Sequence, residues 1–333
     1  MAVTIYIVKR LLISLLLLLV VSFLIYGGVR STVDPTARLS ASKDPQAKIR
    51  EKQRLGLDKP LLVQYKNWLS GVVKGDFGKG DVDRVPVMDK ISAGFFKSLE
   101  LAFWGAIFAI ILGISFGVIS AIRRNKPADY LLSAFSYVGI AVPVFAFAYI
   151  LMNIFAIWLP HKFGQSQPWF YTSGLVDNSY GRAADGLWNF ESIKEYFRHM
   201  IMPIMTLTIQ LIAGWSRYQR GEMIESLQSD YIRTAHAKGM SRRRVYFRHA
   251  FRNSEIPMVN VISLDIAFLL QGLVITETIF TIPGMGSVFV RAFQLGDATT
   301  LCAWVLVTAV IVILANLFAD LMLPIIDPRI RTR

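Results

Sequence analysis

The most informative segment of the chain is Asp230-Tyr-Ile-Arg-Thr-Ala-His-Ala-Lys-Gly239, which Met240 joins to the basic run Ser241-Arg-Arg-Arg244. This polar and basic segment lies between two long apolar segments. A loop that only connected two helices would need neither this length nor the small residues at defined places inside it. We therefore interpret the segment as a surface that contacts another protein.

The composition is that of an integral membrane protein. Of the 333 residues, 54% are hydrophobic, and long runs carry almost no charge. The single cysteine, Cys302, excludes an intrachain disulfide. The formal net charge of +13 would suit nucleic acid, but no nucleic-acid-binding pattern accompanies it. Cytoplasmic loops of multi-span proteins collect Lys and Arg, so we expect no nucleic-acid partner.

A helix needs roughly 20 largely apolar residues to cross the hydrocarbon core. The apolar runs predict an all-α polytopic membrane protein with six transmembrane helices, at residues 11–29, 99–122, 130–159, 200–215, 257–282 and 301–326. The first could be a cleaved signal peptide. Its apolar core is long for one and no Ala-x-Ala site follows, so a retained anchor is the preferred interpretation.

The positions of the basic residues predict the orientation. Basic groups before the first span, at 123–126, at 217–255 and in the tail alternate onto one side. By the positive-inside rule that side is the cytoplasm, which places both termini and the 217–255 loop there.

The spans divide the chain into expected regions. These are an N-terminal helix at 1–29, an external helical segment at 30–97, a transmembrane domain at 98–326 and a cytoplasmic tail at 327–333. Within 30–97 we expect helices over 44–55 and 61–73, separated by Gly56-Leu-Asp-Lys-Pro60. The aromatic external loop 160–199 fits either an interfacial belt or a lid or docking surface.

Capping rules predict a helix, a sharp turn and a second helix in the opening stretch. Asp230 is expected to cap the first helix and Ser241 the second. Gly239 suits the left-handed position that ends a helix. Tyr231, Ala235 and Gly239 would share one flat face that lets a partner approach closely. The alternative is a solvated loop that only fixes topology or touches anionic membrane lipid.

The sequence resembles a known family. Arg233-Thr-Ala-His-Ala-Lys-Gly239 lies where permeases of type I ABC importers carry a Glu-Ala-Ala…Gly signature, here with Arg-Thr-Ala in its place. This form is similar to the dipeptide and oligopeptide branch. The other motifs that resemble this branch are Arg248-His-Ala-Phe-Arg-Asn253 with Ile256-Pro257, Leu55-Gly-Leu-Asp-Lys-Pro-Leu-Leu-Val-Gln-Tyr65, Trp68-Leu69, Gly75-Asp-Phe-Gly78, Ser98-Leu-Glu-Leu-Ala102, Glu277-Thr-Ile-Phe-Thr-Ile-Pro-Gly-Met-Gly286 and Asp327-Pro-Arg-Ile-Arg331.

The resemblance implies a type I ABC importer permease fold and a permease subunit for di- or oligopeptides in the cytoplasmic membrane of a prokaryote. Its implied partners are a second homologous permease, two ATPase subunits or domains and an extracellular substrate-binding protein. ATP and Mg would be bound by the ATPases, and no cofactor, metal or catalytic site is expected in this chain, which has no phosphate-binding Gly-x-x-x-x-Gly-Lys-Ser/Thr loop. The residues expected to couple to an ATPase are Arg233, Thr234, Ala235, Lys238, Gly239 and Ser241.

Polar residues within apolar spans are costly and usually face a cavity or a partner. The candidates for a translocation path are Asn153, Gln210, Asp265, Gln271 and Glu277. Structural hydrogen bonds between spans are an equally good interpretation. The four histidines, at 161, 199, 236 and 249, match no common metal-binding spacing and are interpreted as surface residues.

Other functions stay open. The same scaffold could import nickel chelates, glutathione or oligosaccharides, and a receptor or assembly factor could use the 217–255 loop for docking without transport. An intramembrane enzyme would need a catalytic pair within the spans, and the sequence shows neither two suitably placed aspartates nor a His-Glu-x-x-His motif.

Overall fold

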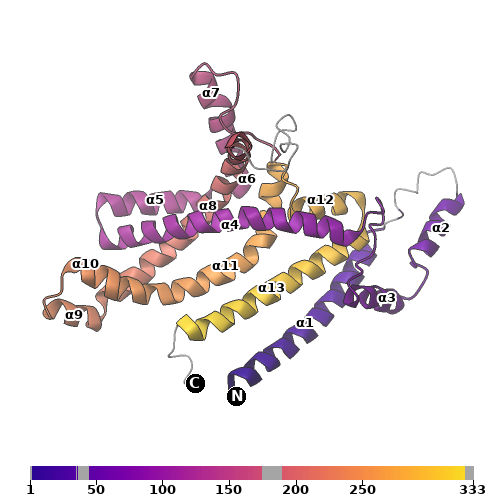
Figure 1. The fold of residues 1–333 in the computed structure, drawn as a ribbon, viewed down its shortest axis with the longest axis horizontal. Helices are drawn as coiled ribbons and strands as arrows, with labels where there is room; N and C mark the ends of the chain where they lie inside the picture. The colour runs from indigo at the N-terminus through magenta and orange to yellow at the C-terminus, as the bar shows by residue number, and fades with distance from the viewer. Residues whose placement is uncertain (1, 35, 37–44, 175–189, 327–333) are drawn as a thin grey trace. The chain divides into compact units, whose positions relative to one another are not determined.

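The computed structural model describes residues 2–34, 36, 45–174 and 190–326. All regular secondary structure in these residues is helical (Figure 1). The chain forms two compact units, one of residues 1–97 and 283–314 and the other of residues 98–282 and 315–333. Helices α4 (Val87–Ile122) and α13 (Ala298–Ile326) contribute to both units.

The first unit is built on helices α1 (Ala2–Thr32), α2 (Pro45–Arg54), α3 (Leu61–Val73) and α12 (Met285–Leu295). Helices α1 and α3 contact each other through aromatic rings. Tyr65 of α3 packs edge-on against Phe23 of α1, with a distance of 5.2 Å between the ring centroids. The Tyr65 hydroxyl also lies 2.7 Å from Ser22 Oγ. The two helices expected within residues 30–97 are confirmed, and Gly56 with a φ of 65° lies in the break between them.

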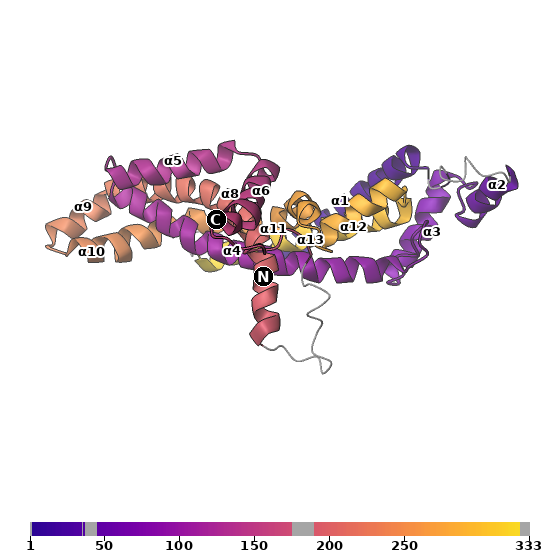
Figure 2. The ribbon, with the colours of Figure 1, turned by 90° about the horizontal axis from the view of Figure 1, so that it is seen from above.

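The second unit surrounds α8 (Phe190–Gln228), against which α5, α6 and α11 pack (Figures 1 and 2). The remaining elements, in chain order, are α5 (Pro127–Ala141), α6 (Val144–Met152), the π-helix η2 (Asn153–Trp158), α7 (Leu159–Lys162), α9 (Asp230–Ala237), α10 (Arg242–Arg244), the π-helix η4 (Val245–Ala250) and α11 (Phe251–Ile279). Its core includes the fully buried residues Leu101, Met202 and Leu273.

The expectation of one helix over residues 130–159 is wrong. The chain leaves the helix at Val142 and Pro143, between α5 and α6. Proline lacks the backbone N–H that continues a helix, and it pushes the preceding residue toward extended geometry. Val142 accordingly has a φ of −83° and a ψ of 121°.

Four of the described helices are long and apolar enough to span a membrane, at Leu11–Thr32, Val87–Ile122, Val144–Lys162 and Ala298–Leu317. The third of these begins directly after the break at Pro143, so it covers only the second part of the predicted 130–159 span. Helix α8, of 39 residues, contains the predicted span at 200–215, and α11, of 29 residues, covers the predicted span at 257–282 as far as Ile279. The total of six spans stays a prediction.

Close approach between α4 and α8 depends on Gly117. A Cβ atom there would lie 2.7 Å from the Ser216 carbonyl oxygen and 2.6 Å from Gln219 Cβ. Small residues at such crossings let two helix backbones come together, which is a common basis of helix association in membranes.

Gly117→Ala should therefore destabilise the protein by about 1–3 kcal/mol, because the helices must separate to admit the methyl group. The matched control is Gly221→Ala on α8, where an added Cβ meets nothing within 4 Å. Thermal unfolding in detergent should show a lower Tm for the first variant and an unchanged or higher Tm for the second. Equal Tm values for the two variants would contradict this packing.

Candidate functional site

Helix α9 begins one residue earlier than capping rules suggested. Its N-cap is Ser229, in extended geometry with a φ of −72° and a ψ of 155°, and Asp230 is the first helical residue. The expectation that Asp230 is the cap is therefore wrong. Its carboxylate still lies in the first turn, where the helix dipole favours negative charge.

The end of α9 follows the prediction. Gly239 has a φ of 74°, its N–H donates to the His236 carbonyl at 2.9 Å, and the Met240 N–H donates to the Ala235 carbonyl at 3.3 Å. These two bonds form a Schellman motif, which needs a left-handed residue at the position of Gly239. Ser241 has the backbone position of the N-cap of α10, but its side chain makes no capping hydrogen bond.

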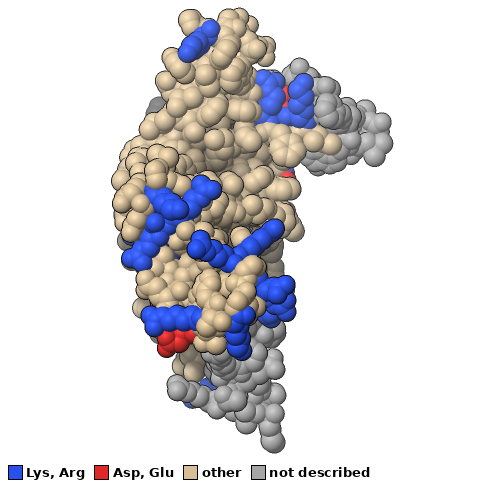
Figure 3. Space-filling model, turned by 90° about the vertical axis from the view of Figure 1, so that its left-hand side faces the viewer, with Lys and Arg blue, Asp and Glu red and all other residues tan. Residues whose placement is uncertain are grey.

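The buried face of α9 is fixed to the rest of the second unit. Ile232 and Ala235, 2% and 6% exposed, join a cluster with Val118 of α4, Met223 of α8 and Val245 of η4. The expectation that Ala235 forms part of an exposed contact face is therefore wrong, because its methyl group packs against the chain's own core. The other residues expected to couple to an ATPase, Arg233, Thr234, Lys238, Gly239 and Ser241, are exposed. Figure 3 views the side of the molecule that carries α9 and α10, where blue Lys and Arg side chains far outnumber red acidic ones.

A partly buried ion pair joins α8 to the start of α5 beside this cluster. Arg220 donates from Nε to Asp129 Oδ1 at 2.7 Å and from Nη2 to Oδ2 at 2.9 Å, a bidentate geometry. The Asn125 N–H and the Ser120 hydroxyl also donate to Asp129. The Arg220 guanidinium, together with these donors, holds the pKa of Asp129 well below its ordinary value. No motif or spacing in the sequence predicts this pair, whose members are 91 residues apart.

A second polar contact that the sequence did not predict lies where α8 crosses the start of α11. Gln219 Nε2 donates to Ser254 Oγ at 3.0 Å, and both side chains are buried. The neighbouring Glu255 is partly buried, and burial raises its pKa to about 7.

The candidate path residues mostly bond neighbouring helices. Asp265 of α11 accepts a hydrogen bond from Trp215 Nε1 of α8 at 2.7 Å. Gln210 of α8 donates to two backbone carbonyls, those of Gly139 and Val142, at 3.0 Å each. These bonds support the alternative interpretation from the sequence, in which such polar residues form structural hydrogen bonds between spans.

The other path candidates differ in their surroundings. Glu277 is fully buried and accepts a hydrogen bond from Ser98. Asn153 is exposed at the start of η2. The side chain of Gln271 lies outside the described residues. A role in translocation stays a prediction for all five candidates.

One histidine is not a surface residue. His199 is only 5% exposed, its ring stacks on Tyr171 at 4.5 Å, and its Nδ1 lies 3.0 Å from the Ser173 carbonyl oxygen. Arg198 binds the same loop through the Pro168 carbonyl at 2.7 Å. The described part of the aromatic 160–199 loop is thus packed on the start of α8, and residues 175–189 lie outside the described residues.

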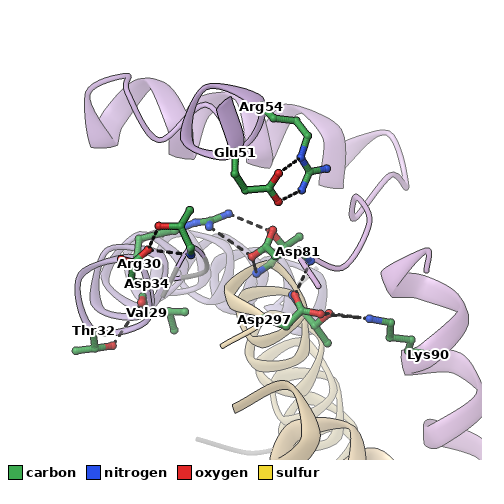
Figure 4. Close-up of polar contacts among 12 residues, drawn as sticks. Val29, Arg30, Thr32, Asp34, Glu51, Arg54, Asp81, Lys90 and Asp297 are labelled. Atoms are coloured by element: carbon green, nitrogen blue, oxygen red, sulfur yellow. Dashed lines mark hydrogen bonds and ion pairs between the residues drawn. The ribbon is translucent and has the colours of Figure 1, made fainter. Parts of the chain in front are cut away.

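The first unit carries a buried polar network at the start of α13 (Figure 4). Asp297 accepts from the backbone N–H groups of Asp81 and Thr300 at 3.0 Å each, and Lys90 Nζ lies 3.3 Å from its other oxygen. Asp81 in turn accepts from Thr299, and Arg30 lies 3.6 Å from it. This network fastens α1 and the start of α4 to the junction of α12 and α13.

The chain's family follows from comparison with known sequences. Residues 86–332 match the family described as binding-protein-dependent transport system inner membrane component, and residues 3–90 match the N-terminal part of such components. The chain belongs to this family. The resemblance inferred from the α9 signature and the other motifs is thereby confirmed.

Curated relatives match along almost the whole chain. The oligopeptide transport system permease protein AppB of Bacillus subtilis is 35% identical, covering 98% of each chain. A probable peptide ABC transporter permease of Sinorhizobium fredii is 34% identical over 98% of this chain and 99% of its own length. The glutathione transport system permease protein GsiC of Escherichia coli is 34% identical over 98% of each.

A solved structure shows the same fold. An inward-facing structure of the MetNI methionine ABC transporter aligns with a TM-score of 0.54, covering 72% of this chain and 98% of the other. The identity is 15%, so this likeness supports the fold alone. The all-α type I ABC importer permease fold expected from the sequence is confirmed.

Asp129→Asn should remove the ionic part of the contact with Arg220 and lower stability at pH 7 by about 1–3 kcal/mol, given that Arg220 is partly exposed. The lowered pKa means that the ion pair stabilises the fold above the ordinary carboxyl pKa of 3.8 and does so progressively less as the pH falls below it.

The difference in Tm between wild type and Asp129→Asn should accordingly narrow between pH 6 and pH 3. Arg123→Gln, an exposed change near the same loop, should leave the wild-type pH dependence intact. A difference that stays constant over this range would contradict the role of the ion pair.

Proposed function

We propose that this family member imports di- or oligopeptides, as one permease subunit of an ATP-binding-cassette transporter. Two curated relatives named for peptide or oligopeptide transport match it along nearly the whole chain, and this observation carries the choice of substrate. The membrane is the cytoplasmic membrane of a prokaryote, with both termini and the 217–255 loop on the cytoplasmic side. The basic loops support that orientation.

The structure of α9 supports the proposed role in coupling. Its outward residues are available to an ATPase subunit, while Ile232 and Ala235 pack into the cluster with α4, α8 and η4. A force applied to the outer face is therefore passed to three helical elements through buried side chains. Closure of two ATPase subunits or domains on ATP and Mg would supply this force, and no ATP site is assigned to this chain.

The remaining partners follow from the same assignment. A second homologous permease would complete the transmembrane path, and an extracellular substrate-binding protein would deliver the peptide. Much of the specificity is then expected in the binding protein. The path itself would admit many side chains.

Import of glutathione is the second candidate function. The relative from Escherichia coli that is named for glutathione transport has 34% identity, the same as the Sinorhizobium fredii relative named for peptides. This relative makes glutathione the alternative solute, and the two relatives named for peptide or oligopeptide transport favour peptides.

Gly239→Glu should reduce recovery of the ATPase subunits with the tagged permease by about tenfold. An added Cβ atom at Gly239 meets nothing within 4 Å, so the glutamate side chain would occupy the space on the outer face of α9 where the ATPase is proposed to bind. The matched control is Gly239→Ala, which carries the same strain at a φ of 74° without the bulk or the charge. We expect the control to recover the ATPases nearly as well as wild type.

Equal losses in the two variants would mean that the turn geometry matters and not a contact at this position. Wild-type recovery in both would exclude Gly239 from the interface. Membrane insertion of each variant, followed through the tag, provides the reference for these comparisons.

The substrate is tested with the complex reconstituted in liposomes together with its binding protein. Dipeptides or oligopeptides should raise the rate of ATP hydrolysis several-fold, whereas nickel chelates and oligosaccharides should not. Stimulation by glutathione and not by other peptides would establish the second candidate function.

A further inference from the structure

The ring of His199 lies between two hydrogen-bond acceptors at the start of α8. Its Nδ1 is 3.0 Å from the Ser173 carbonyl oxygen, and its Nε2 is 3.5 Å from Oε1 of Glu195, one helical turn earlier. His199 and Glu195 are each only 5% exposed. The facing atoms, Nε2 and Oε1, are shielded from water and make no hydrogen bond with any described residue.

A neutral imidazole cannot donate to both acceptors. It has one N–H group and one lone pair, so the lone pair must face either the Ser173 carbonyl or the Glu195 carboxylate. An imidazolium has an N–H group on each nitrogen and can donate to both. A protonated Glu195 carboxyl would serve equally, because its O–H group could donate to Nε2. The buried contact therefore requires one proton more than a neutral histidine beside an ionised glutamate provides.

The charged groups around this pair do not supply the missing donor. Arg198 of the same helix lies 3.5 Å from the other carboxylate oxygen of Glu195, Oε2. On the helices packed against α8, Glu100 of α4 is hydrogen-bonded to a tyrosine of α8, and Glu277 of α11 to a serine of α4. Helix α6 has no charged side chain. The extra proton thus belongs to the pair of His199 and Glu195, whose titrations are coupled by their contact.

This pair fastens one end of the described loop. The Tyr171 N–H donates to the Arg198 carbonyl, and the Gly174 N–H donates to the carbonyl of Phe280 at the end of α11, at 3.0 Å each. The residue between them, Ser173, accepts the bond from His199. The His199 ring also stacks on the Tyr171 ring. Residues 171–174 therefore bridge α8 and α11, and the bridge depends on the position of the His199 ring.

We propose that His199 and Glu195 form a pH-sensitive latch on residues 171–174. The latch holds the loop against α8 and α11 while the pair carries the extra proton, and it weakens when that proton is lost. Since the attached loop binds the proton more tightly than the detached loop, acid favours attachment and a rising pH favours release. The proposed orientation places the latch on the external side. Only that assignment of side rests on the proposed function.

Hydrogen–deuterium exchange of the tagged full-length chain, with the partners that co-purify with it, tests the latch. In detergent both faces of the protein meet the same pH. The reporters are the hydrogen-bonded backbone N–H groups of Tyr171 and Gly174. Their protection is expressed relative to the intrinsic exchange rate at each pH, which removes the pH dependence of the exchange chemistry itself.

Between about pH 5.5 and about pH 8.5, the range that contains the charge change of histidine, the protection of these two groups should fall as the pH rises. The loss of one charge-assisted hydrogen bond in a buried contact corresponds to a fall of about tenfold. The matched control is His161→Gln, which replaces an exposed histidine in the same 160–199 loop and should keep the wild-type profile.

Glu195→Gln separates the latch from ordinary packing. Its amide can donate to Nε2 of a neutral ring while Nδ1–H still donates to the Ser173 carbonyl, so both contacts are satisfied without an extra proton. We expect its protection to stay high at about pH 8.5, as in wild type at about pH 5.5. His199→Gln, which removes the ring, should give low protection at every pH.

Three results would overturn the proposal. The first is a wild-type profile that does not change with pH. The second is a fall with rising pH in Glu195→Gln as large as in wild type, which would show that the pair does not hold the proton. The third is the same fall in His199→Gln, which would assign the pH response to another group and which applies even if Glu195→Gln does not fold. None of these results depends on the solute carried or on the side of the membrane.

Discussion

The burial of Ile232 and Ala235 is the contact on which the proposed coupling depends. An isolated helix of eight residues is unstable in water. Ordering its first turn costs more conformational entropy than its few backbone hydrogen bonds offset. Helix α9 exists because its apolar side chains pack against Val118, Met223 and Val245. The same packing makes α9 a rigid extension of α4, α8 and η4. The stability of α9 and the coupling proposed for it thus depend on the same buried contacts.

Part of this site could be predicted because it depends on local chemistry. Gly239 ends α9 through a backbone conformation that glycine adopts without strain, and such a requirement is visible in the sequence. The face on which Ala235 lies could not be predicted, since a small residue suits a partner surface and a core equally well. The ion pair of Arg220 with Asp129 was missed for another reason. It joins residues far apart in the chain, and each alone resembles an ordinary loop charge.

The same distinction applies to the fold. Hydropathy located the apolar segments and the family motifs located the fold class, but counting apolar residues across 130–159 ignored Pro143. The steric demand of that proline ends α5 and starts α6 in a single step. The carbonyls of Gly139 and Val142, near the end of α5, then receive hydrogen bonds from Gln210 of α8. Gln210, which the sequence suggested as a path residue, therefore has a structural role that arises from the helix break at Pro143.

Polar side-chain contacts between helices hold the second unit together at several places along α8 and α11. Arg220 and Asp129 bind α8 to α5 near the predicted cytoplasmic ends, Trp215 and Asp265 bind α8 to α11, and Ser98 and Glu277 bind α4 to α11. Buried polar contacts with satisfied partners resist sliding, because any displacement would leave a donor or acceptor unpaired. Movement of α9 is thus expected to carry the described helices of this unit as one body. Helix bending, where it occurs, should concentrate where the regular backbone is already interrupted, at Pro143 and at the π-helices η2 and η4.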